Sequence, residues 1–506
     1  MTEGRVAIIG AGPSGAIALE TFLAEGFSDV VVFERQRVVG GTWNLDEHLG
    51  FKNESPIIGT DPDENNDEAV SIPLKILDGT SNRERVTTFS KKRSNHCASS
   101  LYPQVETNVL AELMAFSNKA LPNDYLKTSL EKYEIEDTFR SHETIRNYVS
   151  QLFTDRMHLV QLNTNVEKAW QPDGPGGKWK LILSRASEKY VEYFTEYFDF
   201  LYVANGRFSV PNIPSIEGLK EAVSILPKGS VIHTKEFRDP SEYRDKTVAF
   251  VGSGFSNIDL VHLTQNAGAK LPIHLSLRSV LQVAVPGFAQ PWIQAHPQVK
   301  SIKATNKGSK LTLVFADETE LSDVDVLILG TGYKYSYPFL DDYVKRFGGG
   351  LTDNGGRRSK NLFWSTWWKF DASLAVSSSI TDSVFWAFLE RQSQATAGVW
   401  KKPRKTWPTL EEAEAWEEAR LSKGLKDFHM WWPYFDELFT ALAQHGNHDP
   451  GDVDRYLPLM NKGFEIKGRY WKKLADDWLE THPDDAETYN KTLGFLENRI
   501  ITKIGL

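Results

Sequence analysis

The chain has 506 residues, 41% of them hydrophobic and 25% charged, which is enough for about three domains, or for two with a large elaboration. Its net charge of −9 argues against a nucleic-acid-binding surface, which needs a basic face. The single cysteine, Cys97, excludes an internal disulfide framework and a redox-active cysteine pair, and it fits a reducing compartment.

The sequence carries no recognisable secretory signal and no apolar run of about 18 residues. We therefore expect a soluble, cytoplasmic protein without a membrane span. The oligomeric state stays open, and a homo-oligomer is among the options.

The first predicted element is an apolar strand, residues 6–9, followed at once by a glycine turn and a helical stretch, residues 16–24. In this context G-x-G-x-x-G predicts a dinucleotide site, because its glycines admit the pyrophosphate and the helix N-terminus offers N–H groups. The next strand, residues 30–33, ends at Glu34, whose carboxylate suits a ribose hydroxyl. The turn itself contains Gly10, Gly12, Pro13, Ser14 and Gly15.

A second glycine pair, Gly40-Gly41, runs into Thr42 and Trp43 and indicates either another close approach to a ligand or a plain turn. Farther along, the pattern predicts a helix, then strands and a hairpin, and then a buried strand. These elements cover residues 144–153, 159–165, 165–183 and 198–204. Their order predicts a β-excursion inserted into a Rossmann-like unit.

A new βαβ unit follows a linker at residues 210–218. Its strands (247–251 and 273–277) flank a second glycine turn and a helix (259–267), and the second strand ends at Arg278. A guanidinium there suits the 2′-phosphate of NADP, although a plain surface arginine is the alternative. Because Asn257 replaces the third glycine, we expect helix and strand to lie slightly farther apart. The turn comprises Gly252, Gly254, Phe255, Ser256 and Asn257.

Strands at residues 311–315 and 323–329 complete this unit, and the last runs into Gly330-Thr331-Gly332-Tyr333. We expect this loop at the carboxyl edge of a sheet, where ligands bind. Beyond residue 338 helices and tryptophans dominate, and residues 409–412 form a capping box. Aromatic core packing is the favoured explanation of the tryptophans, with an aromatic substrate pocket as the alternative.

The predicted fold class is α/β, with two Rossmann-like dinucleotide-binding domains, a β-excursion and a helical, tryptophan-rich C-terminal elaboration. We assign residues 1–212 to the first part of an FAD domain, 213–326 to an NADPH domain, and 327–506 to a return to the FAD domain plus a helical extension. Hydride could then pass from NADPH to FAD. Without a cysteine pair, the reduced flavin is left to react with O₂.

At these residues the chain resembles the class B flavin-dependent monooxygenases, and within them the flavin-containing monooxygenases. The resemblance lies in both glycine turns, in the segments 40–43 and 330–333, in Thr107-Asn108, and in a late segment with Glu390 and Gln392. The signature Phe-x-Gly-x-x-x-His-x-x-x-Phe is matched at Gly229, His233 and Phe237, whereas Pro227 replaces its first aromatic residue. Phe237 in place of tryptophan favours the N- and S-oxygenating branch.

The resemblance implies that FAD, reduced by NADPH, forms a C4a-hydroperoxyflavin with O₂. This species would oxygenate a soft nitrogen or sulfur, or an electron-rich ring such as indole, in a small molecule. It also implies a catalytic role for Asn108 beside the flavin, a loop-capping asparagine being the alternative, and a linker-positioning role for His233. The implied FAD-binding residues are Gly10, Gly12, Pro13, Ser14, Gly15, Glu34, Arg35, Gly41, Thr42, Trp43, Thr107, Asn108, Val166, Thr331, Gly332 and Gln392; those for NADPH are Gly252, Gly254, Phe255, Ser256, Asn257 and Arg278.

Two other functions remain open. One is a Baeyer–Villiger monooxygenase that acts on a ketone, and the other is a non-enzymatic nucleotide-binding or redox-sensing protein. We expect no metal site.

Overall fold

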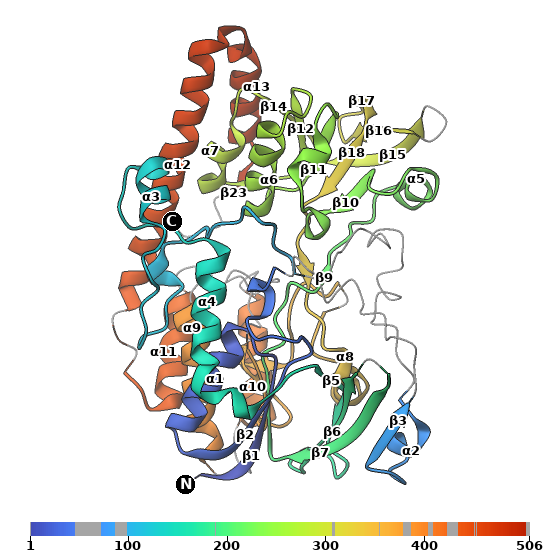
Figure 1. Cartoon of the computed structure of the whole chain (residues 1–506), viewed down its shortest axis with the longest axis vertical. Helices are drawn as coiled ribbons and strands as arrows, with labels where there is room; N and C mark the ends of the chain where they lie inside the picture. The colour runs from blue at the N-terminus through green and yellow to red at the C-terminus, as the bar shows by residue number, and fades with distance from the viewer. Residues whose placement is uncertain are drawn as a thin grey trace.

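The computed structural model describes residues 2–45, 72–86, 99–187, 189–305, 309–353, 355–377, 386–402, 408–422, 434–449, 451 and 453–501. Cys97 lies outside the described residues. In the described part, the chain forms two units that each contain a parallel sheet, one below the other in Figure 1. This confirms the predicted α/β class with Rossmann-like units.

The sheet of the first unit has the strand order β20-β21-β22-β8-β1-β2-β4, and its central strands β22, β8, β1, β2 and β4 are parallel. Its strands are β1 (Thr2–Ile9), β2 (Phe27–Phe33), β4 (Val160–Gln161), β8 (Phe200–Val203), β20 (Leu362–Phe363), β21 (Trp367–Trp368) and β22 (Leu374–Val376). Alternate residues of β1 face opposite cores: Val6 and Ile8 pack among helices, and Ala7 and Ile9 pack against an antiparallel sheet. The packed helices are α1 (Pro13–Ala24), α4 (His142–Phe153), α9 (Trp386–Trp400) and α11 (Tyr434–Gly446).

The antiparallel sheet is the predicted β-excursion, and it has the order β3-β7-β6-β5. Its strands are β3 (Arg83–Val86), β5 (Thr164–Trp170), β6 (Trp179–Ala186) and β7 (Val191–Phe198). The predicted hairpin is confirmed, but the single strand predicted over residues 159–165 is wrong. The chain turns at Asn163, whose φ is 52°, because β4 pairs with β2 whereas β5 pairs with β6. Residues 198–204 are likewise divided, between β7 and β8.

The sheet of the second unit has the order β10-β18-β11-β12-β14 and is parallel throughout. Its strands are β10 (Val231–His233), β11 (Val248–Val251), β12 (Ile273–Ser276), β14 (Ile293–His296) and β18 (Val326–Leu329). One face packs against α6 (Phe255–Asn266), α7 (Val285–Phe288), α12 (Tyr456–Thr481) and α13 (Ala486–Glu497). The other face packs against α5 (Leu219–Ile225) and the antiparallel strands β15 (Val299–Thr305), β16 (Lys310–Phe315) and β17 (Glu320–Val324).

The C-terminal helices join the two units. Helix α12 rises along one side of the molecule from the first unit to the second (Figure 1). Helix α13 is tied to β14 by Thr492, whose hydroxyl donates to the Ile293 carbonyl at 2.7 Å. The remaining elements are α2 (Leu74–Leu77), α3 (Leu126–Tyr133), α8 (Pro338–Val344), α10 (Leu410–Ser422), β9 (Val210–Pro211), β13 (Val280–Leu281), β19 (Tyr333–Lys334) and β23 (Ile500–Ile501).

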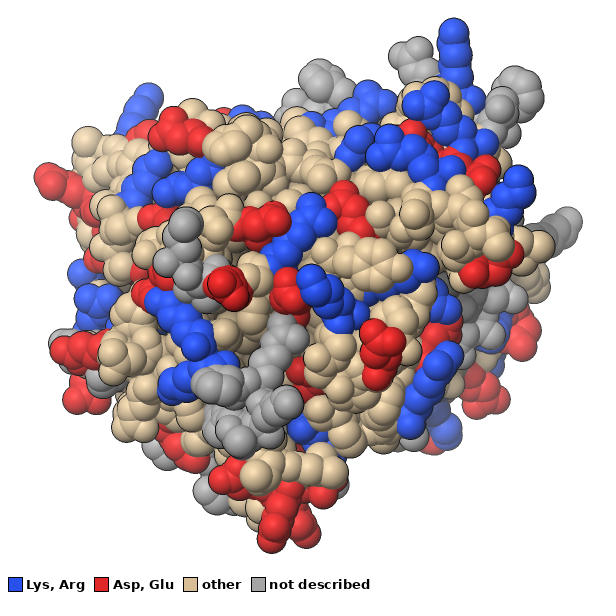
Figure 2. Space-filling model, turned by 90° about the horizontal axis from the view of Figure 1, so that it is seen from below, with Lys and Arg blue, Asp and Glu red and all other residues tan. Residues whose placement is uncertain are grey.

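The tryptophans that the structure describes pack mainly as core. Trp367 and Trp368 are fully buried, and Trp400 stacks on Phe200 with ring centroids 4.6 Å apart. The capping box at the start of α10 is confirmed, since the Thr409 hydroxyl accepts from the Glu412 N–H at 3.2 Å. Among the described helices, none combines the length and apolarity that crossing a bilayer requires. Figure 2 shows basic and acidic side chains interspersed over the face seen from below.

Candidate functional site

The first glycine turn follows β1 and is closed by backbone contacts that only glycine permits. Gly10 has φ +107°, and a Cβ there would lie 2.4 Å from the Ala204 carbonyl oxygen. A Cβ on Gly15 would lie 1.9 Å from the Gly10 carbonyl oxygen, so α1 starts close against β1. Gly12 is the N-cap of α1, and as a glycine it has no side chain to cap the helix. A helix N-terminus that begins at such a glycine turn has the geometry of a pyrophosphate site.

Glu34 follows β2 directly and is tied to this turn. Its carboxylate accepts the N–H of Ala11 at 2.8 Å and the N–H of Gln36 at 2.8 Å, and the side chain is only 5% exposed. An ionised carboxylate has about four acceptor sites, so acceptor capacity remains for ribose hydroxyls. The predicted pairing of glycine turn and acid is thus present in the fold.

The glycine pair Gly40-Gly41 packs against the first glycine turn. The Gly40 N–H donates to the Ala11 carbonyl at 2.8 Å, and a Cβ on Gly41 would come within 2.9 Å of the Gly12 Cα. This close approach explains why glycine is needed here, with Gly41 at φ +61°. Thr42 and Trp43 continue from it as a single 3₁₀ turn.

The other glycine turn, after β11, repeats the geometry of the first. Gly252 also has φ +107°, and a Cβ there would lie 2.4 Å from the Gly330 carbonyl oxygen. The Gly252 N–H donates to the Ser276 carbonyl at 2.9 Å, just as Gly10 donates to Phe33. Gly254 is the N-cap of α6 and again has no side chain to cap the helix, and Gly254 and Ser256 are exposed.

Asn257 stands at the position of the third glycine, and the chain accommodates it at Gly330. Asn257 is fully buried, and its amide donates to the carbonyls of Val251 at 3.0 Å and Gly252 at 2.8 Å. A Cβ on Gly330 would lie 2.0 Å from Oδ1 of Asn257, so the absence of a side chain at residue 330 makes room for the asparagine. The side chain thereby stabilises the turn.

Arg278 lies two residues beyond the end of β12, at the carboxyl edge of the second sheet. It is exposed and forms no ion pair with any residue that the structure describes. Its guanidinium is therefore available to a phosphate. The two units thus differ in the charged side chain near the end of the second strand: Glu34 directly follows β2, whereas Leu277 follows β12 and Arg278 comes next.

Residues 99–102 bridge the two units. The Thr42 and Ser100 hydroxyl oxygens lie 2.9 Å apart, which ties the segment to the first unit. On the other side, the Tyr102 hydroxyl donates to the Asp259 carboxylate of α6 at 2.6 Å, and Arg238 donates to the Ser99 carbonyl at 2.8 Å. The sequence did not predict this bridge, because contacts between residues far apart in the chain leave no repeating pattern in the sequence.

Thr107 and Asn108 follow this bridge and differ in how their side chains are used. The Thr107 hydroxyl donates to the Val109 carbonyl at 2.9 Å and accepts the Arg140 N–H at 3.0 Å, so Thr107 fixes the loop. Asn108 is half-buried, and its amide forms no hydrogen bond within the described part of the chain. It does not serve as a loop cap there.

The loop after β18 is held by the linker between the units. The Thr331 hydroxyl donates to the Asn212 carbonyl at 2.6 Å, and the Asn212 N–H donates to the Gly332 carbonyl at 2.8 Å. His233 bonds the same Gly332 carbonyl through Nε2 at 3.1 Å, while its Nδ1 accepts the Lys235 N–H. Burial lowers the pKa of His233 to about 3, so the ring is neutral and positions this loop.

The other residues implied by the resemblance lie deeper in the first unit. Val166 is on β5 and is 5% exposed, and half-buried Arg35 donates to the Ser209 hydroxyl at 3.2 Å. Gln392 of α9 is fully buried, and its amide donates to Thr366 at 3.0 Å and to the Ser365 carbonyl at 3.2 Å. These contacts link α9 to the strands of the first sheet.

A cavity of about 340 Å³ lies between residues 111–121 and the helices α9 and α11. Its wall combines basic and acidic side chains, namely Arg140, Arg391, Arg455, Glu112, Asp137 and Glu390. None of the described glycine-turn residues lines it. Within the described residues, no group of three or more metal-ligating side chains occurs.

Comparisons with known proteins agree with this geometry. A family model described as "FMO-like: Flavin-binding monooxygenase-like" matches residues 86–280 and 290–351, half of the chain. The chain is 26% identical over 370 residues to a flavin-containing monooxygenase, iboF, of Amanita muscaria, covering 67% of this chain and 66% of the relative. It is 27% identical to a trimethylamine monooxygenase of Roseovarius sp., covering 68% of this chain and 64% of the relative. The matched region thus spans slightly less than two thirds of these relatives.

Other matches extend over nearly the whole chain. Senecionine N-oxygenase of Tyria jacobaeae is 27% identical over 494 residues, covering 94% of this chain and 87% of the relative. The structure of S-allyl-L-cysteine S-oxygenase from Allium sativum superposes with a TM-score of 0.67 at 22% identity, covering 96% of this chain and 99% of that one, which shows a shared fold. With both glycine turns in place and half of its length matched, the chain belongs to the flavin-binding monooxygenase-like family, whose cofactors are FAD and NADPH.

Proposed function

We propose that this protein catalyses the NADPH- and O₂-dependent oxygenation of a soft nitrogen or sulfur atom in a small molecule. The observation that carries the proposal is the pair of glycine turns, equal in backbone geometry but followed by Glu34 in one unit and Arg278 in the other. An acid suits a ribose with free hydroxyls, as in FAD, whereas a guanidinium suits the 2′-phosphate of NADPH.

In this proposal FAD binds the first unit, through the residues around Gly10–Gly15, Glu34 and Gly41–Trp43, and NADPH binds around Gly252–Asn257 with Arg278. The corresponding domains are residues 1–212 and 327–506 for FAD and 213–326 for NADPH. The strand order supports a division into two units, because β10, β18, β11, β12 and β14 form one sheet and the chain re-enters the first sheet at β20. Since β18 ends at Leu329, the second boundary falls after that residue, and α12 and α13 pack against the sheet of the second unit.

The bound flavin supplies hydride acceptance and O₂ activation. The overall reaction consumes NADPH, a proton and O₂, adds one oxygen atom to the substrate, and releases the other as water. The chain binds both nucleotides, orients them and limits access of water, because water promotes wasteful release of hydrogen peroxide. Within the described residues the Asn108 amide has no hydrogen-bond partner, which supports its assignment as the residue that hydrogen-bonds the flavin or NADP⁺.

The choice of nitrogen or sulfur rests on the relatives' names, which include trimethylamine monooxygenase, senecionine N-oxygenase and S-allyl-L-cysteine S-oxygenase. An electron-rich ring such as indole remains within the proposed substrate class. The proposed location is the cytoplasm, which the single cysteine of the chain supports.

Product analysis tests the proposal. The FAD-loaded protein is incubated with NADPH, O₂ and, in parallel, a tertiary amine, a thioether and a cyclic ketone. We expect an N-oxide or a sulfoxide in proportion to the NADPH consumed. A lactone formed from the ketone alone would instead establish a Baeyer–Villiger enzyme. Protein that stays colourless after FAD is added, and leaves NADPH unconsumed, would favour a non-enzymatic role.

A further inference from the structure

We propose that Glu106 and Lys467 form a buried ion pair that positions Asn108, so that both are positioning residues for the oxygenation. The inference rests on the proposed function for its catalytic consequence. Its structural part, a tie between helix α12 and the Asn108 loop, stands independently of that function.

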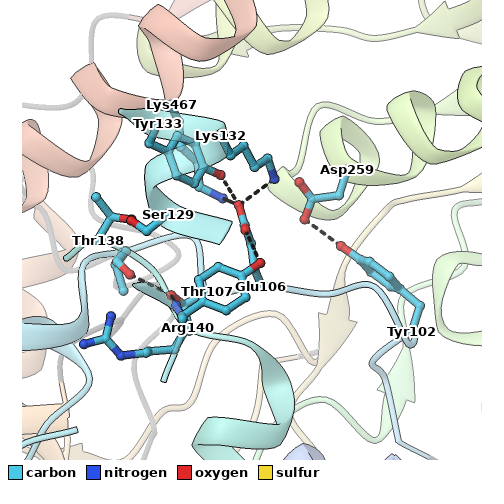
Figure 3. Close-up of polar contacts among 12 residues, drawn as sticks. Tyr102, Glu106, Thr107, Ser129, Lys132, Tyr133, Thr138, Arg140, Asp259 and Lys467 are labelled. Carbon is cyan, nitrogen blue, oxygen red and sulfur yellow. Dashed lines mark hydrogen bonds and ion pairs between the residues drawn. The ribbon is translucent and has the colours of Figure 1, made fainter. Parts of the chain in front are cut away.

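Glu106 immediately precedes Thr107 and is surrounded by donors. Its Oε1 accepts from the ammonium groups of Lys132 at 3.0 Å and Lys467 at 3.3 Å, and also from the Tyr133 hydroxyl. Its Oε2 accepts from the Tyr125 hydroxyl at 2.9 Å. Figure 3 shows Lys132, Tyr133 and Lys467 converging on this carboxylate beside Thr107.

The pair is buried on both sides. Glu106 is 8% exposed and Lys467 is 4% exposed. Burial alone raises the pKa of Glu106, but the Lys467 and Lys132 ammonium groups and the Tyr133 hydroxyl outweigh burial and lower it to about 2. The carboxylate is therefore ionised at neutral pH. The Lys467 ammonium also lies 4.6 Å from the centroid of the Phe139 ring.

A buried charge is costly unless it is paired, so such a pair fixes the relative position of the elements that carry it. Here the elements are α12 and the loop before Asn108, which are 361 residues apart in the sequence. The loop is held from the opposite side by the Thr107 N–H, which donates to the Arg140 carbonyl at 2.8 Å. Glu106 and Thr107 are thus anchored, and Asn108 keeps its amide for the cofactors.

Helix α12 reaches the second glycine turn as well. One turn before Lys467, Phe464 stacks on Phe255 of α6, with centroids 5.6 Å apart and planes at 7°. Gly463 lies against the Asn108 loop, where an added Cβ would meet Leu110 at 3.4 Å. One stretch of α12 therefore contacts both the Asn108 loop and the NADPH turn. The Glu106–Lys467 pair sets where Asn108 lies relative to NADP⁺.

The test uses Glu106→Gln, Lys467→Met and the double variant. Lys472→Met is the matched control, because Lys472 lies on the same helix in an exposed pair with Asp476 at 2.6 Å. Two quantities are measured on the FAD-loaded protein: amide hydrogen exchange of residues 107–110, and the share of consumed NADPH that appears as hydrogen peroxide. NADP⁺ affinity is titrated separately on the oxidised protein.

Either single variant is expected to speed exchange in residues 107–110 and to raise the peroxide share, each by roughly tenfold, a size typical of residues in one ion-pair network. The rate of flavin reduction at saturating NADPH should change by less than about twofold, because hydride transfer does not need Asn108. The changes in exchange rate and peroxide share in the double variant should be smaller than the combined changes of the two single variants. NADP⁺ affinity should fall modestly, and Lys472→Met should match the wild type.

Exchange and peroxide share that stay at the wild-type level in both single variants would overturn the proposal, as would strictly additive effects or an equal change in Lys472→Met. If Lys467→Met fails to fold, Lys467→Arg and Glu106→Asp keep both charges and shift the contact. These variants should then give intermediate changes, and wild-type values would refute the role. If the wild type oxygenates nothing, hydrogen exchange and NADP⁺ titration still decide the structural part.

Discussion

Replacing Arg278 with alanine should separate the two nicotinamide coenzymes. A guanidinium contact with a phosphate is a charge-assisted hydrogen bond of about 1.5–3 kcal/mol, so its loss should raise KM for NADPH by roughly 10- to 150-fold. NADH lacks the 2′-phosphate, and its KM should change by less than about twofold. Arg278 is exposed and has no ion pair with any described residue, so the variant should fold normally.

The assay is steady-state oxidation of NADPH and of NADH by the FAD-loaded protein. Lys270→Ala provides the control. Lys270 is exposed near the opposite end of β12, and its substitution removes the same charge as Arg278→Ala. Its KM values should match those of the wild type. Equal increases for both coenzymes in Arg278→Ala, or the same selective loss in Lys270→Ala, would refute the assignment of Arg278 to the 2′-phosphate.

Two further predictions concern folding. Gly15→Ala places a Cβ 1.9 Å from the Gly10 carbonyl oxygen and should lower the free energy of unfolding by about 1–3 kcal/mol or more. A Cβ at residue 12 instead meets the Gly41 backbone at ordinary van der Waals distance, 3.5 Å from its Cα, so Gly12→Ala should fold normally but lose FAD affinity. Urea unfolding and FAD titration distinguish the two, and equal stability losses would contradict the packing argument. Burial lowers the pKa of His233 from 6.5 to about 3, so its contribution is complete above pH 6.5 and falls by about 1.4 kcal/mol per pH unit toward pH 3. His233→Gln should therefore flatten the fall of Tm between about pH 6 and pH 4, and an unchanged slope would contradict neutral burial.

The turns and their strands were predictable from the sequence because their determinants are local. A glycine turn between an apolar strand and a helix has few other conformations, and both predicted turns are present with matching φ angles at Gly10 and Gly252. The expected wider spacing of helix and strand at Asn257 stays a prediction. Gly330 provides the space and Asn257 bonds the end of the strand, a relationship across more than seventy residues that no local pattern encodes.

The break at Asn163 and the contacts that join the units were not predictable, because both depend on residues far apart in the sequence. The break at Asn163 depends on which sheet each flanking strand joins, and Tyr102 meets Asp259 only after both units fold. One signal was present: Lys467 lies four residues after Gly463 and four before Trp471, on the buried side of α12. A lysine at such a position indicates a buried partner, although it does not identify Glu106.

The most direct test of the central claim is isotope labelling with ¹⁸O₂. The FAD-loaded protein is supplied with NADPH and a tertiary amine or thioether under ¹⁸O₂, and the product is analysed by mass spectrometry alongside the NADPH consumed. The account predicts one ¹⁸O atom in each product molecule and a yield that follows NADPH. A product whose oxygen comes from water, or NADPH consumption in which all the O₂ ends as hydrogen peroxide for both substrates, would contradict it.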